Sequence, residues 1–348
     1  MKLGKFVAAL AALCLATTCS AFRRTVPDIS PLEYSYTKYA GGPTIQKYIS
    51  YTGDGIKSFW IAAFIHADNK HDYCVIGQMA SIGNGTLQTY ASVMDITEKT
   101  YYGETFHTKG QMSNNATAGD SGLLHIWATT ADQISEIKAV STIPKVPYDF
   151  TLTPKGPLLY QAGGGDYHWG LGTAWEFDAP ETQLTGTLTI GNKKVNIVPE
   201  KSMAWFDWQW GPGFAPGGWH GGAILLDNGV KILPMITNPS DLYTQVSIST
   251  MVFPDGHHEV YPIDPDLHPR NPWVSNVSGL TYYNDYQINI PGKKTSLHSH
   301  LWMEGGEATV LADPSIANSI NDAFAIFTGT FDGKPVTGWG IQERRVGS

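Results

Sequence analysis

The sequence has few cysteines and few charges, and each scarcity excludes a class of protein. Cys14 and Cys19 lie within residues 1–21, which are predicted below to be a signal peptide, so Cys74 is left alone and no disulfide framework is expected. Charged residues make up 16% of the 348 residues, and 31 acidic residues outnumber 23 Lys plus Arg. The net charge of −8 and the lack of a basic cluster argue against nucleic acid or an anionic membrane surface as the partner.

Long apolar runs are also missing, because no segment reaches the roughly 20 residues that a membrane span needs. The apolar stretch 6–16 follows Lys2 and Lys5 and precedes small residues that end at Ala21. This order is typical of a secretory signal peptide, so residues 1–21 are predicted to be removed. Three sequons predict N-glycosylation on the secretory route, at Asn84, Asn115 and Asn276.

Alternation with a period of two dominates the rest of the chain, and apolar residues make up 42% of the full sequence. Turn signals separate alternating runs that we expect to pair as hairpins, among them 184–190 with 195–198, 223–226 with 230–236, and 323–331 with 336–341. The one helix that the pattern suggests is short, over 313–322. We therefore predict an all-β protein, with barrels or sandwiches and no βαβ units.

The densest Gly and Pro stretch, 211–218, suggests a boundary within the chain. It divides the expected mature protein into an N-terminal β domain, 25–213, and a C-terminal β-barrel domain, 214–348. Ligand sites favour domain junctions, and tryptophans gather at this one, so we expect a pocket here.

Alternation in the segment 205–211 places Trp205, Asp207 and Gln209 on one face of a strand. A carboxylate between aromatic rings is costly to bury unless it is hydrogen-bonded or protonated. A protonated carboxyl would serve as a general acid near neutral pH, so Asp207 is a catalytic candidate. The alternative is that Asp207 accepts backbone hydrogen bonds and only closes the barrel.

Two histidines flanked by aromatic residues, His168 and His220, are the other catalytic candidates, because such a side chain can shuttle a proton or donate to a carbonyl. Each would equally suit a hydrogen-bonded core position. Further candidates share an aromatic or buried context and are predicted to hold the substrate: Trp205, Gln209, Tyr167, Trp169, Trp219 and Glu176.

No metal or cofactor site is predicted. His298 and His300 would present two imidazoles on one strand face, an arrangement that metal sites use. No third potential ligand lies at a sequence spacing typical of metal sites, so we expect a histidine pair without a metal.

The C-terminal half of the chain resembles a known family. The run Leu184-Thr-Gly-Thr-Leu188, the pattern Trp205-x-Asp207-x-x-x-Gly211 and the ending Gly340-Ile-Gln-Glu343 are similar to the signature of the hydroxyneurosporene synthase/AttH-like proteins. The resemblance spans roughly residue 160 to the C-terminus and implies two packed lipocalin-like (calycin) β-barrels. Where relatives often carry a charged residue, this chain has Trp208-Gln-Trp210.

The resemblance also implies cofactor-independent chemistry on a small hydrophobic natural product. We expect a hetero-Diels–Alderase that joins a quinone methide to a terpenoid alkene, with dehydration of the precursor as a further step. Asp207 or His168 would be the acid, and His220, Gln209 and Tyr167 would hold the carbonyl. The alternatives are a kievitone-hydratase-like enzyme that adds water to an isoprenoid double bond, a secreted glycoside hydrolase and a non-catalytic lipocalin-type carrier.

Overall fold

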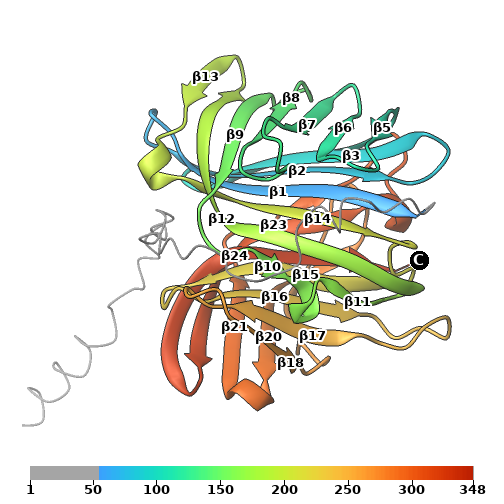
Figure 1. Cartoon of the computed structure of the whole chain (residues 1–348), viewed down its shortest axis with the longest axis vertical. Coiled ribbons are helices and arrows are strands. Elements are labelled where there is room, and N and C mark those ends of the chain that lie inside the picture. The colour runs from blue at the N-terminus through green and yellow to red at the C-terminus, as the bar shows by residue number, and fades with distance from the viewer. Residues whose placement is uncertain (1–54, 348) are drawn as a thin grey trace, which may run out of the picture.

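The computed structural model describes residues 55–347, and nearly all of their regular structure consists of antiparallel β-strands. Two sheets built from consecutive hairpins lie against each other, as Figure 1 shows. The predicted all-β class is therefore confirmed. The predicted signal peptide, 1–21, lies outside the described residues. None of the described helical segments is long and apolar enough to cross a bilayer.

The first sheet has 14 strands and curls into a nearly closed barrel, in the order β4-β3-β2-β1-β14-β12-β9-β8-β7-β6-β5. Three short strands, β10, β11 and β13, pair with the long strand β12. The strands are β1 (Ile56–His66), β2 (Asp72–Ser81), β3 (Thr86–Asp95), β4 (Thr100–Lys109), β5 (Gln111–Met112), β6 (Ala118–Asp120), β7 (Leu124–Ala128), β8 (Ile137–Ser141), β9 (Tyr148–Pro154), β10 (Leu159–Tyr160), β11 (Asp166–Trp169), β12 (Gly172–Ile190), β13 (Lys193–Asn196) and β14 (Met203–Gly211).

The second sheet has 10 strands in the order β18-β17-β16-β15-β24-β23-β21-β20-β19, with β22 paired to β23. Its strands are β15 (Gly218–Leu226), β16 (Lys231–Thr237), β17 (Ser247–Val252), β18 (His258–Pro262), β19 (Arg270–Val274), β20 (Thr281–Ile290), β21 (Thr295–Leu301), β22 (Glu307–Ala308), β23 (Ile320–Phe331) and β24 (Lys334–Val346). Short 3₁₀ turns complete the described chain: η1 (Gln161–Gly163), η2 (Pro199–Lys201), η3 (Pro291–Lys293) and η4 (Ile316–Asn318).

The predicted hairpins are present, but the predicted helix over 313–322 is wrong. Only the turn η4 forms there, and β23 begins at Ile320. Ile320 pairs with Ala308 of β22, and Asp322 pairs with Glu343 of β24. Pairing on both sides satisfies the backbone of this segment within the sheet, and this outweighs a weak local helix preference.

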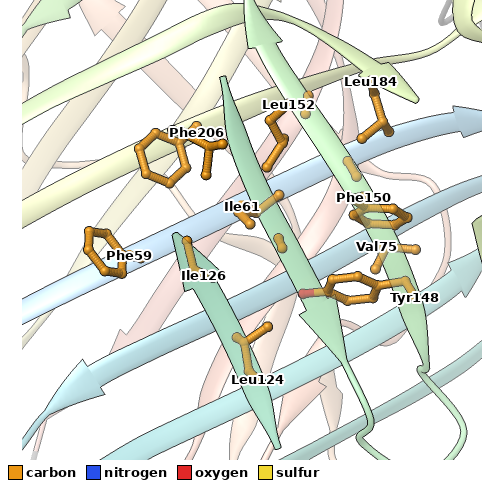
Figure 2. Close-up of a cluster of buried hydrophobic side chains, with 14 of the residues drawn as sticks. Phe59, Ile61, Val75, Leu124, Ile126, Tyr148, Phe150, Leu152, Leu184 and Phe206 are labelled. Atoms are coloured by element: carbon orange, nitrogen blue, oxygen red, sulfur yellow. The ribbon is translucent and has the colours of Figure 1, made fainter. Parts of the chain in front are cut away.

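Three apolar clusters form the core, and strand alternation decides which cluster each residue joins. Phe59 and Ile61 point into the first barrel, together with the residues labelled in Figure 2. Trp60 and Ala62, on the opposite face of β1, pack between the two sheets. A third cluster is enclosed by the second sheet, most of whose strands contribute to it, and this curled sheet is called the second barrel below. Because β1 is buried on both faces, residues 59–65 of this strand form a continuous apolar run. Cys74, the one cysteine in the part of the chain that the structure describes, is buried between the sheets, and burial raises its pKa.

A buried ion pair ties the two sheets together. The ammonium of Lys231 on β16 contacts the carboxylate of Glu181 on β12, and the two residues are 2% and 8% exposed. Burial lowers the pKa of Lys231 to about 8. Removing one member of such a pair leaves the other charge buried and unpaired, which costs more than removing both.

We therefore expect Lys231→Met to lower the free energy of unfolding by about 3–5 kcal/mol, because Glu181 keeps an uncompensated buried charge. The double variant Lys231→Met/Glu181→Leu should recover most of this loss, since no charge then remains. Urea unfolding of both variants and the parent chain measures the difference. A single variant as stable as the parent would show that this pair is not a buried link.

Candidate functional site

A small cavity lies between the two sheets. Its volume is about 40 Å³, which is room for about three water molecules. A larger guest therefore has to displace side chains at its rim. The cavity is lined by Ser58, Trp60, Gln78, Trp169, Glu176, Asp178, Trp205, Asp207, Gln209, Phe214, Trp219, Gly222, Ala223, Leu233, Met235 and Glu343. Six of the predicted site residues are among these: Asp207, Trp205, Gln209, Trp169, Trp219 and Glu176.

Three carboxyl groups from the first sheet converge on the cavity. Glu176 and Asp178 are two residues apart on β12, so they point to the same face. Asp207 on β14 is the direct cross-strand partner of Asp178. As a result, one carboxyl oxygen from each of the three lies within 4.8 Å of the others. These three carboxyl groups are called the carboxyl cluster below.

Burial and mutual repulsion keep protons on the carboxyl cluster. Loss of hydration raises the pKa of Glu176 to about 7. Burial and the nearby Glu176 raise the pKa values of Asp178 and Asp207 well above their ordinary range. The described cavity lining contains no Lys, Arg or His to offset these charges. Neighbouring carboxylates in a dry site cannot all ionise together, so part of the cluster is protonated at neutral pH.

Hydrogen bonds distinguish the three members. Glu176 accepts from the Tyr167 hydroxyl and, at 3.1 Å, from the Gln209 amide, and both bonds lower its pKa. Asp178 accepts from the Trp205 indole N–H at 2.6 Å. Asp178 and Asp207 each have one carboxyl oxygen without a hydrogen-bond partner, but Asp178 is fully buried, whereas Asp207 is partly exposed. Glu176 is therefore the most acidic member, whereas Asp207 is the group free to deliver a proton.

The second sheet adds a fourth carboxyl group, Glu343 on β24, which accepts a hydrogen bond from the Trp219 indole N–H. Burial and the nearby Asp322 raise the pKa of Glu343 to about 8. Asp322 does not line the cavity itself, but it accepts a hydrogen bond from the indole N–H of the lining residue Trp60 at 2.9 Å. The sequence reasoning did not select these two residues or Asp178. Asp178 was detectable as the same-face neighbour of Glu176, but Glu343 and Asp322 reach the site only through the contact between the sheets.

Aromatic rings form the rest of the wall. The Trp169 and Trp219 rings meet edge to face with centroids 5.6 Å apart, and Phe214 stacks on Trp219 at 5.4 Å. Tyr167 reaches the site through its hydrogen bonds to Glu176 and Gln209. The cavity therefore combines apolar walls with a few proton-carrying groups, as small-molecule sites typically do.

The structure does not place the two predicted histidines in the lining of this cavity. His168 is exposed, because alternation along β11 turns it away from the buried Tyr167 and Trp169. His220 points into the second barrel, where its ring meets Tyr286 at a centroid distance of 5.0 Å. Burial and the nearby Arg344 lower the pKa of His220. Neither histidine is placed to exchange a proton with a guest in the cavity.

The fold and the site together define a two-sheet, calycin-like protein with a buried acidic cavity between its halves. No protein-family model matches the chain. The chain is similar to kievitone hydratase from Fusarium solani subsp. phaseoli, at 25% identity over 84% of this chain and 82% of that enzyme. It is also similar to dehydratase asqC from Emericella nidulans, at 24% identity over 61% of this chain and 62% of that enzyme.

Two solved structures have the same fold as this chain. The crystal structure of kievitone hydratase from Nectria haematococca superposes with a TM-score of 0.81 at 21% identity, covering 92% of this chain and 98% of that one. A putative AttH from Nitrosomonas europaea gives a TM-score of 0.72 at 15% identity, covering 88% and 98%. The resemblance predicted from the sequence is confirmed: the chain is a homologue of kievitone hydratase and has the AttH-like fold.

Proposed function

We propose that this chain is a hydratase/dehydratase-type lyase that acts on an apolar phenolic or isoprenoid natural product. The observation that carries the proposal is the carboxyl cluster, with oxygens within 4.8 Å of one another in an aromatic cavity. Adding or removing water needs one group that donates a proton and one that accepts a proton. Relatives named as a hydratase and a dehydratase support the same class of reaction.

Asp207 is assigned as the proton donor and Glu176 as the proton acceptor. In dehydration, the Asp207 carboxyl proton moves to the substrate hydroxyl, and the C–O bond breaks with its electron pair leaving on water. The Glu176 carboxylate removes a proton from the adjacent carbon, or from a conjugated phenol, as the new double bond forms. Hydration runs through the same steps in reverse.

The cluster then has to return to its starting state. Dehydration leaves Asp207 ionised and Glu176 protonated, so one proton must pass between them. The short separation of the cluster oxygens allows this transfer directly or through Asp178. Tyr167 and Gln209 hold the Glu176 carboxylate in place throughout. The apolar walls exclude bulk water and strengthen these electrostatic interactions.

The expected hetero-Diels–Alder addition is a finer proposal built on the same step. Loss of water from a hydroxymethyl phenol or tropolone gives a quinone methide, and the rings of Trp169, Trp219 and Phe214 offer a surface on which this plane and an alkene can stack. A protonated carboxyl next to the carbonyl stabilises the negative charge that develops there.

The proposal predicts oxygen exchange with solvent. With kievitone as the test substrate in water enriched in oxygen-18, the enzyme should form a hydrated product that carries one labelled oxygen, as mass spectrometry would show. Incubation without protein is the control. Unchanged substrate across a panel of phenolic isoprenoids would contradict lyase activity. For the finer proposal, a quinone-methide precursor with an alkene should give adduct in enantiomeric excess, and a racemic adduct would reject the cycloaddition.

Secretion is part of the proposal. The sequon residues Asn84, Asn115 and Asn276 are all exposed, so each can carry a glycan without disturbing the core. The predicted signal peptide would direct the chain to the compartment in which these glycans are added.

A further inference from the structure

The second sheet carries a cluster of two histidines and an aspartate, none of which lines the cavity. His298 and His300 lie on β21, and Asp285 lies on the neighbouring strand β20. Oδ1 of Asp285 contacts Nε2 of His298 at 2.9 Å and Nδ1 of His300 at 2.6 Å. Both imidazole nitrogens therefore point to the same carboxylate oxygen.

Strand geometry creates this arrangement. His298 and His300 are two residues apart, so they share one face of β21, whereas Leu297 and Leu301 point into the core of the second barrel. Asp285 is the direct cross-strand partner of His300. The third group is thus supplied by the adjacent strand, which the spacing of the histidines in the sequence does not reveal.

The two histidines of this cluster are accessible to an ion from solvent, whereas the aspartate is buried and held by a further hydrogen bond. The side chains of His298 and His300 are 38% and 24% exposed, whereas that of Asp285 is 5% exposed. The other oxygen of Asp285 accepts a hydrogen bond from the Asn271 amide. Outer hydrogen bonds of this kind orient the ligands of metal sites.

We propose that His298, His300 and Asp285 bind a divalent transition-metal ion, with Zn²⁺ the best match. Neutral imidazole nitrogens together with one carboxylate suit zinc, copper and nickel and suit the harder Mg²⁺ and Ca²⁺ poorly. Solvent would complete a four-coordinate site on the exposed side. On binding, the ion takes the place of the two histidine–aspartate hydrogen bonds. The single proton of each neutral ring then moves from the nitrogen that faced Asp285 to the other ring nitrogen, so that the freed nitrogen can bind the ion. The site is independent of the proposed lyase activity.

Zinc binding to the full chain tests the proposal. After dialysis against a chelator, isothermal titration with Zn²⁺ should show one ion per chain, and Zn²⁺ should raise the midpoint of thermal unfolding. His300→Ala and His298→Ala should each weaken binding by at least about 100-fold, and Asn271→Ala should weaken it by about 10–100-fold. His71→Ala is the matched control, because His71 is a partly exposed histidine paired with Asp95 away from the cluster. It should leave zinc binding unchanged.

Two results would overturn the proposal. One is no zinc binding by the folded chain at micromolar zinc. The other is binding that survives the His298→Ala/His300→Ala double variant, and in that case its loss in Asp207→Asn would place the ion at the carboxyl cluster. Circular dichroism of each variant shows whether the fold is kept, which the outward position of both histidines favours.

Discussion

Replacing Asp207 with asparagine is expected to lower kcat by about 10²–10⁴-fold, which is the usual contribution of a general acid. Asparagine keeps the shape of the side chain but has no proton of suitable acidity to give to a leaving hydroxyl. The same change should raise the midpoint of thermal unfolding, because Asp207, with its raised pKa, has to take up a proton when the chain folds at neutral pH, whereas an asparagine side chain does not. Activity and stability should thus move in opposite directions, as happens when an active site stores unfavourable interactions.

Turnover of kievitone and a thermal melt measure both effects of Asp207→Asn. Asp332→Asn is the matched control, because it makes the same chemical change in an exposed turn whose φ of 51° asparagine tolerates well. The control should change neither quantity. If Asp207→Asn turned over as fast as the parent chain, the proton would have to come from another group, and Glu343 would be the next to test.

The second large expected effect is a loss of folding stability as the pH rises. Glu176 and Glu343 have pKa values near 7 and 8 in the folded protein, raised by burial from the 4.5 of an exposed glutamate. A carboxyl with a raised pKa binds its proton more tightly in the folded state, so stability falls as pH rises between the unfolded and folded pKa values. Each pKa unit corresponds to about 1.4 kcal/mol, so the loss should reach several kcal/mol.

Between pH 6.5 and 8 the buried carboxyl groups set the pH dependence of stability, and Asp178 and Asp207, whose pKa values are also raised, act in the same direction as the two glutamates. His220 has a lowered pKa, so its contribution increases with pH only up to about 6.5, the ordinary histidine value. The pKa of Lys231 is lowered to about 8, so this residue makes the folded protein more stable with rising pH only above that value. Thermal melts should therefore show a falling midpoint between pH 6.5 and 8. The fall should be smaller in Glu343→Gln, and an equal fall in that variant would contradict the assignment of Glu343.

Much of the fold could be predicted because a strand has a period of two. Alternation in β14 correctly separated Trp205, Asp207 and Gln209, which line the cavity, from Phe206 and Trp208, which join the core of the first barrel. The family resemblance supplied what alternation cannot, namely that two such sheets pack together.

The remaining parts of the site depend on contacts that a single strand does not encode. Glu343 faces Asp207 only because the second sheet covers the first, and this packing is not visible in local spacing. His168 is a different case, because its neighbours Tyr167 and Trp169 are both apolar in character and buried. The same alternation that selected Asp207 would have turned His168 toward solvent, so this correction was available from the sequence.

The walls of the cavity are contributed by residues from Ser58 to Glu343, nearly the whole described chain. Either sheet produced alone would lack part of the cavity wall, since the first sheet holds the carboxyl cluster and the second holds Trp219 and Glu343. Hybrids that join the front half of one homologue to the back half of another would each enclose a new chamber. Such shuffling would test whether substrate choice changes while the carboxyl cluster, which we propose to move protons, is kept.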